Sequence, residues 1–302
     1  MNSNPKIIFI VGPTAVGKSD VAVELAKKID GEIVSCDSMQ VYREVPIAGN
    51  QPSAEQLREI PHHLIGCLSV TDSFDVNLYR HMAAPVIEDI LKRGRKAIVT
   101  GGSGLYASAL LDGIFEGEGP NLPLREQLLD EAREHGPDFL YRRLEELDPA
   151  SAQKIHPNNV KRVIRALEVC LISQQPISEL QRHREGLWGK YLIRMFGLSM
   201  QRQALYEKIN RRVWKMIDQG LVDEIKSLNG IPLGRTAQYL IGVREIQRHL
   251  RGEYLLEKAI EDIRLNTRHL AKRQMTWFKK DPRVQWIDIT NGMKSWEKIF
   301  EN

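Results

Sequence analysis

Short apolar runs alternate with longer amphipathic segments through the first third of the 302-residue chain. Apolar runs over residues 6–11, 32–36 and 96–100 predict buried strands, and the pattern between them predicts helices after Gly17 and over residues 75–92. Strands that alternate with helices form parallel α/β sheets, whose ligands bind at the carboxyl ends of the strands. We therefore expect a parallel sheet with flanking helices, and functional residues just after its strands.

The pattern changes where glycine and proline interrupt the chain, at Gly113, Gly117, Gly119, Pro120 and Pro123. Helical segments then follow as far as residue 184, which predicts an inserted all-helical domain over residues 117–189. The core domain is then composed of residues 1–116 and 190–302. In its second part we expect a strand at 191–198, helices at 202–219, 221–228 and 253–279, and a last strand at 284–289.

The composition is that of an ordinary folded protein. Hydrophobic residues make up 42% of the chain, enough for a sizeable core, and the formal net charge of +4 is compatible with a nucleic-acid partner without requiring one. No apolar stretch approaches the ~20 residues that a membrane span needs. Cys36, Cys67 and Cys170 lack the paired spacing of metal sites, so we expect reduced thiols. These features predict a cytoplasmic protein without membrane contact, which we expect to act as a monomer.

A glycine-rich phosphate-binding loop follows the first predicted strand. It consists of Gly12, Pro13, Thr14, Ala15, Val16, Gly17, Lys18 and Ser19. Its glycines let backbone N–H groups turn toward an anion at the N-terminus of the next helix. Lys18 is then placed to meet terminal phosphate oxygens, and Ser19 is placed to hold Mg²⁺. A plain strand-to-helix turn with a surface lysine is the alternative, but the complete spacing favours a site for a polyphosphate.

A carboxylate and a hydroxyl follow two further strands at the same edge of the expected sheet. Asp37 comes just beyond the apolar pair Ile33 and Val34, and Ser103 lies in a glycine-rich turn after residues 96–100. In this place Asp37 can serve Mg²⁺ through water, or accept a proton from a nucleophile above the phosphates. An aspartate or serine after a strand can equally be only a helix cap or a turn former. The neighbouring phosphate loop favours the functional interpretation.

Ordered motifs along nearly the whole chain resemble one family, the tRNA dimethylallyltransferases, also called tRNA isopentenyltransferases. The resemblance is carried by residues 12–19, 37–42, 101–106, 155–168, 205–213 and 271–278. Two positions depart from the family pattern. Ser103 stands where many members have threonine, which keeps a hydroxyl, and Val243 after Gly242 replaces a commoner tyrosine, which puts any role of that tyrosine in doubt.

The resemblance implies a P-loop NTPase-like fold that is used without ATP hydrolysis. The loop would bind the diphosphate of dimethylallyl diphosphate, and the dimethylallyl group would pass to N6 of the adenosine immediately 3′ of the anticodon in tRNA. Lys18, Arg212 and Mg²⁺ would stabilise the leaving diphosphate. Asp37 would orient the amine and remove its proton, while Ser103 would add a hydrogen bond to the adenine or to Asp37.

The resemblance also implies that the partner is a tRNA anticodon stem-loop, whose target base must flip out of its stack. The candidates for contact with the target base and its neighbours are Asp37, Ser38, Met39, Gln40 and Ser103. The candidates for RNA contact in the insertion are Arg125, Arg162 and Arg165. Exposed arginines on a charged helix can also be merely solvated.

A basic stripe is predicted on the last long helix. The stripe consists of basic residues that recur every four positions: Arg264, Arg268 and Lys272. We expect Arg268 and Lys272 to contact RNA phosphates. A second set recurs every seven residues and predicts the face toward the core: Ile263, Leu270 and Trp277. A solvated charged face is again the alternative to RNA contact.

Two other classes of function remain open from the residues alone. The loop and sheet would suffice for an ATP-dependent kinase of a nucleoside or small metabolite, in which Asp37 would deprotonate a hydroxyl. A noncatalytic RNA-binding module could also retain a phosphate loop to sense a nucleotide. Prenylation of free adenine nucleotides would need the same diphosphate chemistry but no anticodon-binding insertion. The long insertion and the basic C-terminal helix count against this reaction and against the kinase, and the presence of Asp37 counts against the RNA-binding module.

Overall fold

The chain folds into two compact units in a computed structural model, which describes residues 5–115, 119, 121–290 and 292. The first unit combines residues 1–111 and 187–302, and the second comprises residues 112–186. Each edge lies a few residues before the one expected from the glycine and proline pattern. Gly117 and Pro120, which contributed to that expectation, lie outside the described residues.

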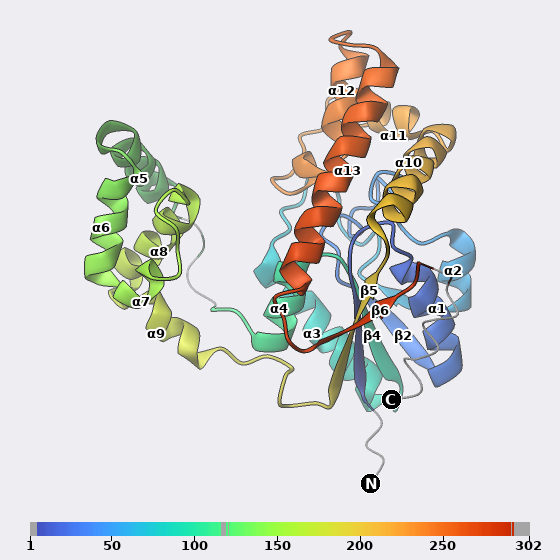
Figure 1. Cartoon of the computed structure of the whole chain (residues 1–302), viewed down its shortest axis with the longest axis horizontal. Helices are drawn as coiled ribbons and strands as arrows, with labels where there is room; N and C mark the ends of the chain where they lie inside the picture. The colour runs from blue at the N-terminus through green and yellow to red at the C-terminus, as the bar shows by residue number, and fades with distance from the viewer. Residues whose placement is uncertain (1–4, 116–118, 120, 291, 293–302) are drawn as a thin grey trace. The chain divides into compact units, whose positions relative to one another are not determined.

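A parallel sheet forms the centre of the first unit (Figure 1). It has six strands in the order β3-β2-β4-β1-β5-β6. All five residues of β1 are apolar and buried, because both faces of the sheet are covered. The expected parallel α/β architecture is confirmed. The strands are β1 (Ile7–Val11), β2 (Gly31–Ser35), β3 (His62–His63), β4 (Lys96–Gly101), β5 (Ile193–Ser199) and β6 (Val284–Asp288).

Helices cover both faces of this sheet. On one face, α1 (Lys18–Ile29) packs with the first half of α10 (Arg202–Asp218) over the side chains of Ile8 and Ile10. The other face carries Ile7 and Phe9 and a larger set of helices: α3 (Val76–Lys92), α4 (Gly104–Asp112), α11 (Leu221–Ser227), α12 (Val243–Leu250) and α13 (Leu256–Phe278). Alternate residues of β1 therefore belong to different cores, as expected for a strand buried on both sides.

Several short elements escaped the sequence pattern. The helix α4 is buried on most sides, so it shows no polar face that would mark it as a helix. The helix α2 (Ala54–Glu59) buries no residue at all and is held by a capping box between Ser53 and Gln56. The edge strand β3 has two residues, too few for any alternation to be read. The helix α12 was likewise not predicted.

The second unit is all helical and has its own apolar core. Leu128, Leu140, Leu144, Val163 and Leu167 are fully buried within it. Its helices are α5 (Leu122–His135), α6 (Pro137–Leu147), α7 (Pro149–Ala152), α8 (Val160–Ser173) and α9 (Ile177–Leu180). In neither unit do the described residues include a helix long and apolar enough to cross a membrane. The three cysteines are free thiols, and only Cys67 is exposed.

Candidate functional site

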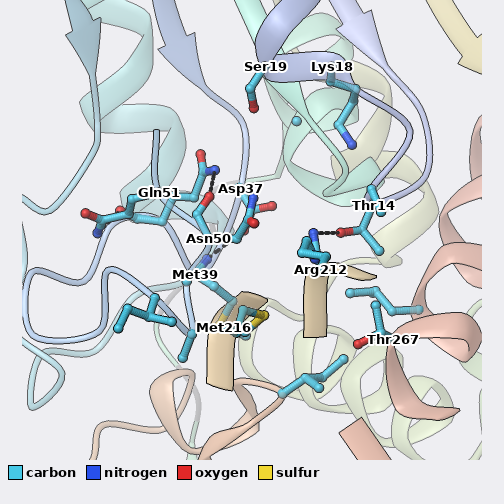
Figure 2. A pocket seen from close by; sticks show the side chains of 18 of the residues that line it. Thr14, Lys18, Ser19, Asp37, Met39, Asn50, Gln51, Arg212, Met216 and Thr267 are labelled. Carbon is cyan, nitrogen blue, oxygen red and sulfur yellow. Dashed lines mark hydrogen bonds between the residues drawn. The ribbon is translucent and has the colours of Figure 1, made fainter. Parts of the chain in front are cut away.

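A cavity of about 850 Å³ lies in the first unit, and the residues that follow three strands line it (Figure 2). The phosphate loop after β1 contributes Thr14, Lys18 and Ser19. Asp37, after β2, and Ser103, after β4, stand at the same edge of the sheet. The predicted meeting of these three segments is therefore present, and α10 and α13 supply much of the remaining wall.

Two glycines let the phosphate loop turn from β1 into α1. Gly12 has a φ of 141°, and a Cβ added there would lie 2.6 Å from the carbonyl oxygen of Leu198 on the neighbouring strand. Gly17 has a φ of 114° directly before the first residue of α1. A side chain at either position would strain the backbone. The Lys18 ammonium donates hydrogen bonds to the carbonyl oxygens of Gly12 at 3.1 Å and Pro13 at 2.8 Å, so it lies over the loop.

Burial makes the charged forms of the two cationic side chains at the cavity, Lys18 and Arg212, less stable. It lowers the pKa of Lys18 to about 8, with nearby Asp37 opposing the shift and Arg212 adding to it. Burial likewise lowers the pKa of Arg212 to about 10, again opposed by Asp37. An anion that entered between these two side chains would favour their charged forms. The cavity is therefore electrostatically suited to a negatively charged ligand.

Arg212 is joined to the phosphate loop by a hydrogen bond. Its Nη1 donates to the Thr14 hydroxyl at 2.7 Å (Figure 2), and the backbone N–H of Thr14 donates to Oε1 of Gln274 at 2.7 Å. Gln274 lies on α13 and is only 8% exposed. Sequence reasoning gave Arg212 a role beside the diphosphate but gave Gln274 none.

The turns that carry Asp37 and Ser103 touch each other through their backbones. A Cβ added to Gly101 would lie 1.9 Å from the carbonyl oxygen of Cys36, so only glycine permits this approach. The backbone N–H of Ser103 donates to the same carbonyl at 3.3 Å, and the Ser103 hydroxyl accepts a hydrogen bond from the N–H of Ser38 at 3.3 Å. The predicted pair of functional side chains is therefore held as one unit.

Asp37 also forms a turn, as the alternative interpretation allowed. Its Oδ1 accepts a hydrogen bond from the backbone N–H of Met39 at 2.9 Å. This contact fixes the carboxylate at the cavity wall, where Figure 2 shows it between Lys18 and Met39. The two interpretations of Asp37 are compatible, because one side chain can shape a turn and face a ligand.

Gln40 is oriented by its neighbours at the rim of the cavity. Its Oε1 accepts a hydrogen bond from the Ser35 hydroxyl at 2.8 Å, and its Nε2 donates to the carbonyl oxygen of Asn50 at 2.8 Å. Both ends of the amide are therefore held in place, so the side chain is already ordered at the rim of the cavity.

Comparison with known proteins agrees with this geometry. The family model described as IPP transferase matches residues 40–281. The chain belongs to this family. Proteins named tRNA dimethylallyltransferase from Thermotoga petrophila and Carboxydothermus hydrogenoformans are each 42% identical to it, over 287 and 300 residues. The match with the first relative covers 94% of this chain and 93% of that protein. The match with the second covers 98% of this chain and 95% of that protein.

Two solved structures resemble the whole fold. The full-length tRNA isopentenylpyrophosphate transferase from Bacillus halodurans has a TM-score of 0.72 and 39% identity, and the match covers 99% of this chain and 95% of that one. A eukaryotic dimethylallyltransferase described as acting on tRNA has a TM-score of 0.80 and 29% identity, covering 97% of this chain and 76% of that one. The P-loop NTPase-like fold with a helical insertion is therefore that of the IPP transferases.

Two of the arginines predicted to contact RNA have partners inside the insertion of this IPP transferase. Arg125 donates two hydrogen bonds of 2.8 Å to the carboxylate of Glu168, and Arg165 donates one of 2.6 Å. Glu168 is fully buried, so these arginines neutralise a charge within the core of the unit. Arg162 on the same helix α8 is exposed.

The expected stripes on α13 need correction. Ile263 is buried, but Leu270 lines the cavity and Trp277 is 42% exposed. The face of α13 toward the interior is more polar than expected and contains Ala259, Ile260, Ile263, Thr267, Ala271, Gln274 and Phe278. The buried positions recur at intervals of three and four residues, as the 3.6-residue period of a helix requires, and not every seven.

Part of the expected basic stripe packs against the neighbouring helix. The Arg264 guanidinium lies 4.7 Å from the centre of the Trp214 ring, and that of Arg268 lies 5.0 Å from the centre of the Tyr206 ring, both on α10. Arg268 also donates to the Asn210 side chain at 2.9 Å. These cation–π contacts join the two helices, which run side by side in Figure 1. Lys272 remains exposed.

Val243 replaces the family's commoner tyrosine without facing the cavity. It is 2% exposed and belongs to the main core, directly after Gly242 with its φ of 108°. The Val243 side chain packs in the core and is not among the residues that line the cavity.

Proposed function

We propose that the chain transfers a dimethylallyl group from dimethylallyl diphosphate to N6 of the adenosine immediately 3′ of the anticodon in tRNA. The observation that carries the proposal is the convergence of the phosphate loop, Arg212 and Asp37 on one cavity in a member of the IPP transferase family. The names of its relatives, which cover nearly the whole chain, agree with it.

The diphosphate would lie against the loop at residues 12–19. As the C–O bond of an allylic diphosphate breaks, positive charge spreads over the allyl group and negative charge collects on the diphosphate. Lys18 and Arg212 would flank the place where this negative charge develops, and their burial would strengthen the attraction between each cation and the diphosphate. Loop amides at the N-terminus of α1 add further donors.

The adenine would approach from the side of Asp37 and Ser103. The exocyclic N6 is a weak nucleophile because its lone pair is delocalised into the ring. Asp37 would accept a hydrogen bond from the amine, orient it toward the allyl carbon and take its proton as the C–N bond forms. Ser103, fixed by its contact with Ser38, would hold the base or the carboxylate in place.

Mg²⁺ is the ion that we expect to accompany the diphosphate. The described residues contain no group of three or more His, Cys, Asp or Glu side chains that could hold a metal by themselves. Mg²⁺ usually takes only one or two protein oxygens and completes its shell with waters and substrate phosphates. The hydroxyl of Ser19 lines the same cavity as Asp37 and fits that requirement. When bound, the ion would neutralise part of the charge on the diphosphate.

The tRNA would present its target base by flipping it into the cavity. An anticodon loop is partly unstacked already, so this step costs only a few kcal/mol. We propose that residues 37–40 and Ser103 meet the flipped base and its neighbours. Arg162 and Lys272, which are exposed, are the better placed of the predicted phosphate contacts, because Arg125, Arg165 and Arg268 already have protein partners.

A transfer assay tests the proposal. Purified protein is mixed with Mg²⁺, dimethylallyl diphosphate labelled in the allyl group, and an unmodified anticodon stem-loop, without ATP. We expect label on N6 of the base next to the anticodon. Label that reached RNA only when ATP was supplied, or that reached free AMP more readily than the stem-loop, would refute the proposal. Phosphorylation of a small acceptor by ATP would instead favour the kinase alternative.

A further inference from the structure

The backbone of the phosphate loop is attached to a helix that lies far away in sequence. The N–H of Thr14 donates to Oε1 of Gln274 at 2.7 Å, across a separation of 260 residues. Gln274 is almost completely buried on α13, so this amide is held in one position. The bond is partly buried, and breaking it would leave the buried Gln274 amide without this donor, which is costly.

The other functional group of Thr14 orients Arg212. The Thr14 hydroxyl accepts a hydrogen bond of 2.7 Å from Nη1 of Arg212. Among the described residues it is the only group to which the Arg212 guanidinium donates, and Nε of the same side chain is buried without a partner. Loss of the Thr14 hydroxyl would therefore remove the hydrogen bond that orients the guanidinium.

Gln274 also contacts the turn that carries Ser103. A Cβ added to Gly102 would lie 2.1 Å from Nε2 of Gln274, so the turn and the amide pack at close range. One side chain of α13 thus lies against both the phosphate loop and the Ser103 turn.

We infer that Gln274 and Thr14 are positioning residues, which act in series to aim the Arg212 guanidinium at the diphosphate. Gln274 fixes the loop backbone, and Thr14 transmits that position to Arg212 through its hydroxyl. The inference rests on the proposed transfer reaction. It adds that Thr14 serves the reaction through an arginine of α10, and that α13 belongs to the diphosphate site through the amide of Gln274.

Paired substitutions at Thr14 separate this role from simple packing. Thr14→Val keeps the shape and removes the acceptor, whereas Thr14→Ser keeps the hydroxyl. We expect the valine variant to lose about 10- to 100-fold in kcat/KM for dimethylallyl diphosphate, the range for a hydrogen bond to a charged group. The serine variant should stay within about threefold of the parent. Gln274→Met should behave like the valine variant, and Gln203→Met, an exposed change on α10, is the matched control.

A double-mutant cycle with Arg212→Met shows whether the residues act in series. If Thr14 acts through Arg212, Thr14→Val should change kcat/KM by less than about twofold once Arg212 is absent. Independent losses that multiply would overturn the inference, as would a lowered melting temperature with unchanged kcat/KM. Circular dichroism confirms folding of each variant. Because the parent protein is measured in the same assay, absence of any transfer by the parent would instead refute the proposed function.

Discussion

Asp37 combines a structural hydrogen bond with a position facing the ligand cavity. Its Oδ1 holds the N–H of Met39, an interaction that asparagine can also make. We predict that Asp37→Asn keeps both substrates bound with similar affinity but lowers kcat by roughly 10² or more, because the amide cannot take the proton from N6. Equilibrium binding and single-turnover transfer measure the two effects separately. Near-normal turnover would exclude Asp37 as the base.

Lys18 predicts a pH dependence. Its pKa of about 8 means that the ammonium loses its proton as pH rises through that value, and the diphosphate then loses a cationic partner. We predict that kcat/KM for dimethylallyl diphosphate falls as pH rises above about 8, since this parameter reports the free enzyme. Lys18→Arg is the control, because arginine stays charged and its profile should remain flat in this range. The same decline in the arginine variant would assign it to another group.

Single residues were predictable where their signal was local. The loop at residues 12–19 and Asp37 stand at fixed places after apolar runs, so the sequence placed them at the correct edge of the sheet. Gln274 could not be assigned, because its partner Thr14 lies 260 residues away and no periodicity links them. Arg125 and Arg165 both pair with the buried Glu168, a contact that the sequence pattern did not indicate, and RNA contact by these arginines stays a prediction.

The helix α8 carries a buried carboxylate that ties it to α5. Burial opposes the ionisation of Glu168, but hydrogen bonds from Arg125 and Arg165 outweigh it and hold the pKa of this carboxyl below its usual value. The ionised Glu168 carboxylate therefore stabilises the folded protein at neutral pH, which is above the pKa of this carboxyl in the unfolded chain. This stabilisation is lost as pH falls through the pKa of Glu168 in the folded protein.

We predict that Glu168→Gln lowers the free energy of unfolding by about 1–3 kcal/mol at pH 7, because two guanidinium groups lose their charged acceptor. Urea unfolding of the full chain, followed by a probe within residues 112–186, measures the loss. Glu134→Gln, an exposed change on α5, serves as the comparison and should have little effect. Equal free energies of unfolding for the two variants would show that the hydrogen bonds of Glu168 with Arg125 and Arg165 do not stabilise the fold.

The helix α13 shows what periodicity can and cannot give. The sequence predicted this helix and the common face of Arg264, Arg268 and Lys272. The sequence did not predict that this face packs against Trp214 and Tyr206 of α10. The spacing of charges along one helix contains no information about the helix beside it. Within the stripe Lys272 is exposed, whereas Arg264 and Arg268 are partly buried against α10.

At the scale of the whole molecule, the alternation of strands and helices was sufficient to predict a parallel sheet. The strand order was not predictable, because the pairing of β2 with β4, and of β1 with both β4 and β5, depends on crossovers that the hydrophobic pattern does not record. The helical insertion was visible as a break at glycine and proline, since a separate unit needs its own core and its own boundary.

Exposed cations on the two units predict a salt-dependent affinity for RNA. We expect Arg162→Gln and Lys272→Gln each to lower the slope of log K against log salt by roughly 0.7 to 0.9 for an anticodon stem-loop, if each neutralises one phosphate. Fluorescence anisotropy at several salt concentrations measures the slope. Lys92→Gln on α3 is the control, because this lysine is exposed and does not line the cavity. A slope unchanged by either variant would remove that residue from the RNA interface.

The anchoring of the loop by Gln274 has a consequence for biosynthesis. Residues 12–19 leave the ribosome early, yet the amide that secures them is translated near the end of the chain. A nascent polypeptide that stops before α13 would possess the β1 and α1 segments without the contact that orders the turn between them. Competence to hold an isoprenoid diphosphate should therefore arise late, when translation has passed residue 274, and incomplete chains should not consume that metabolite.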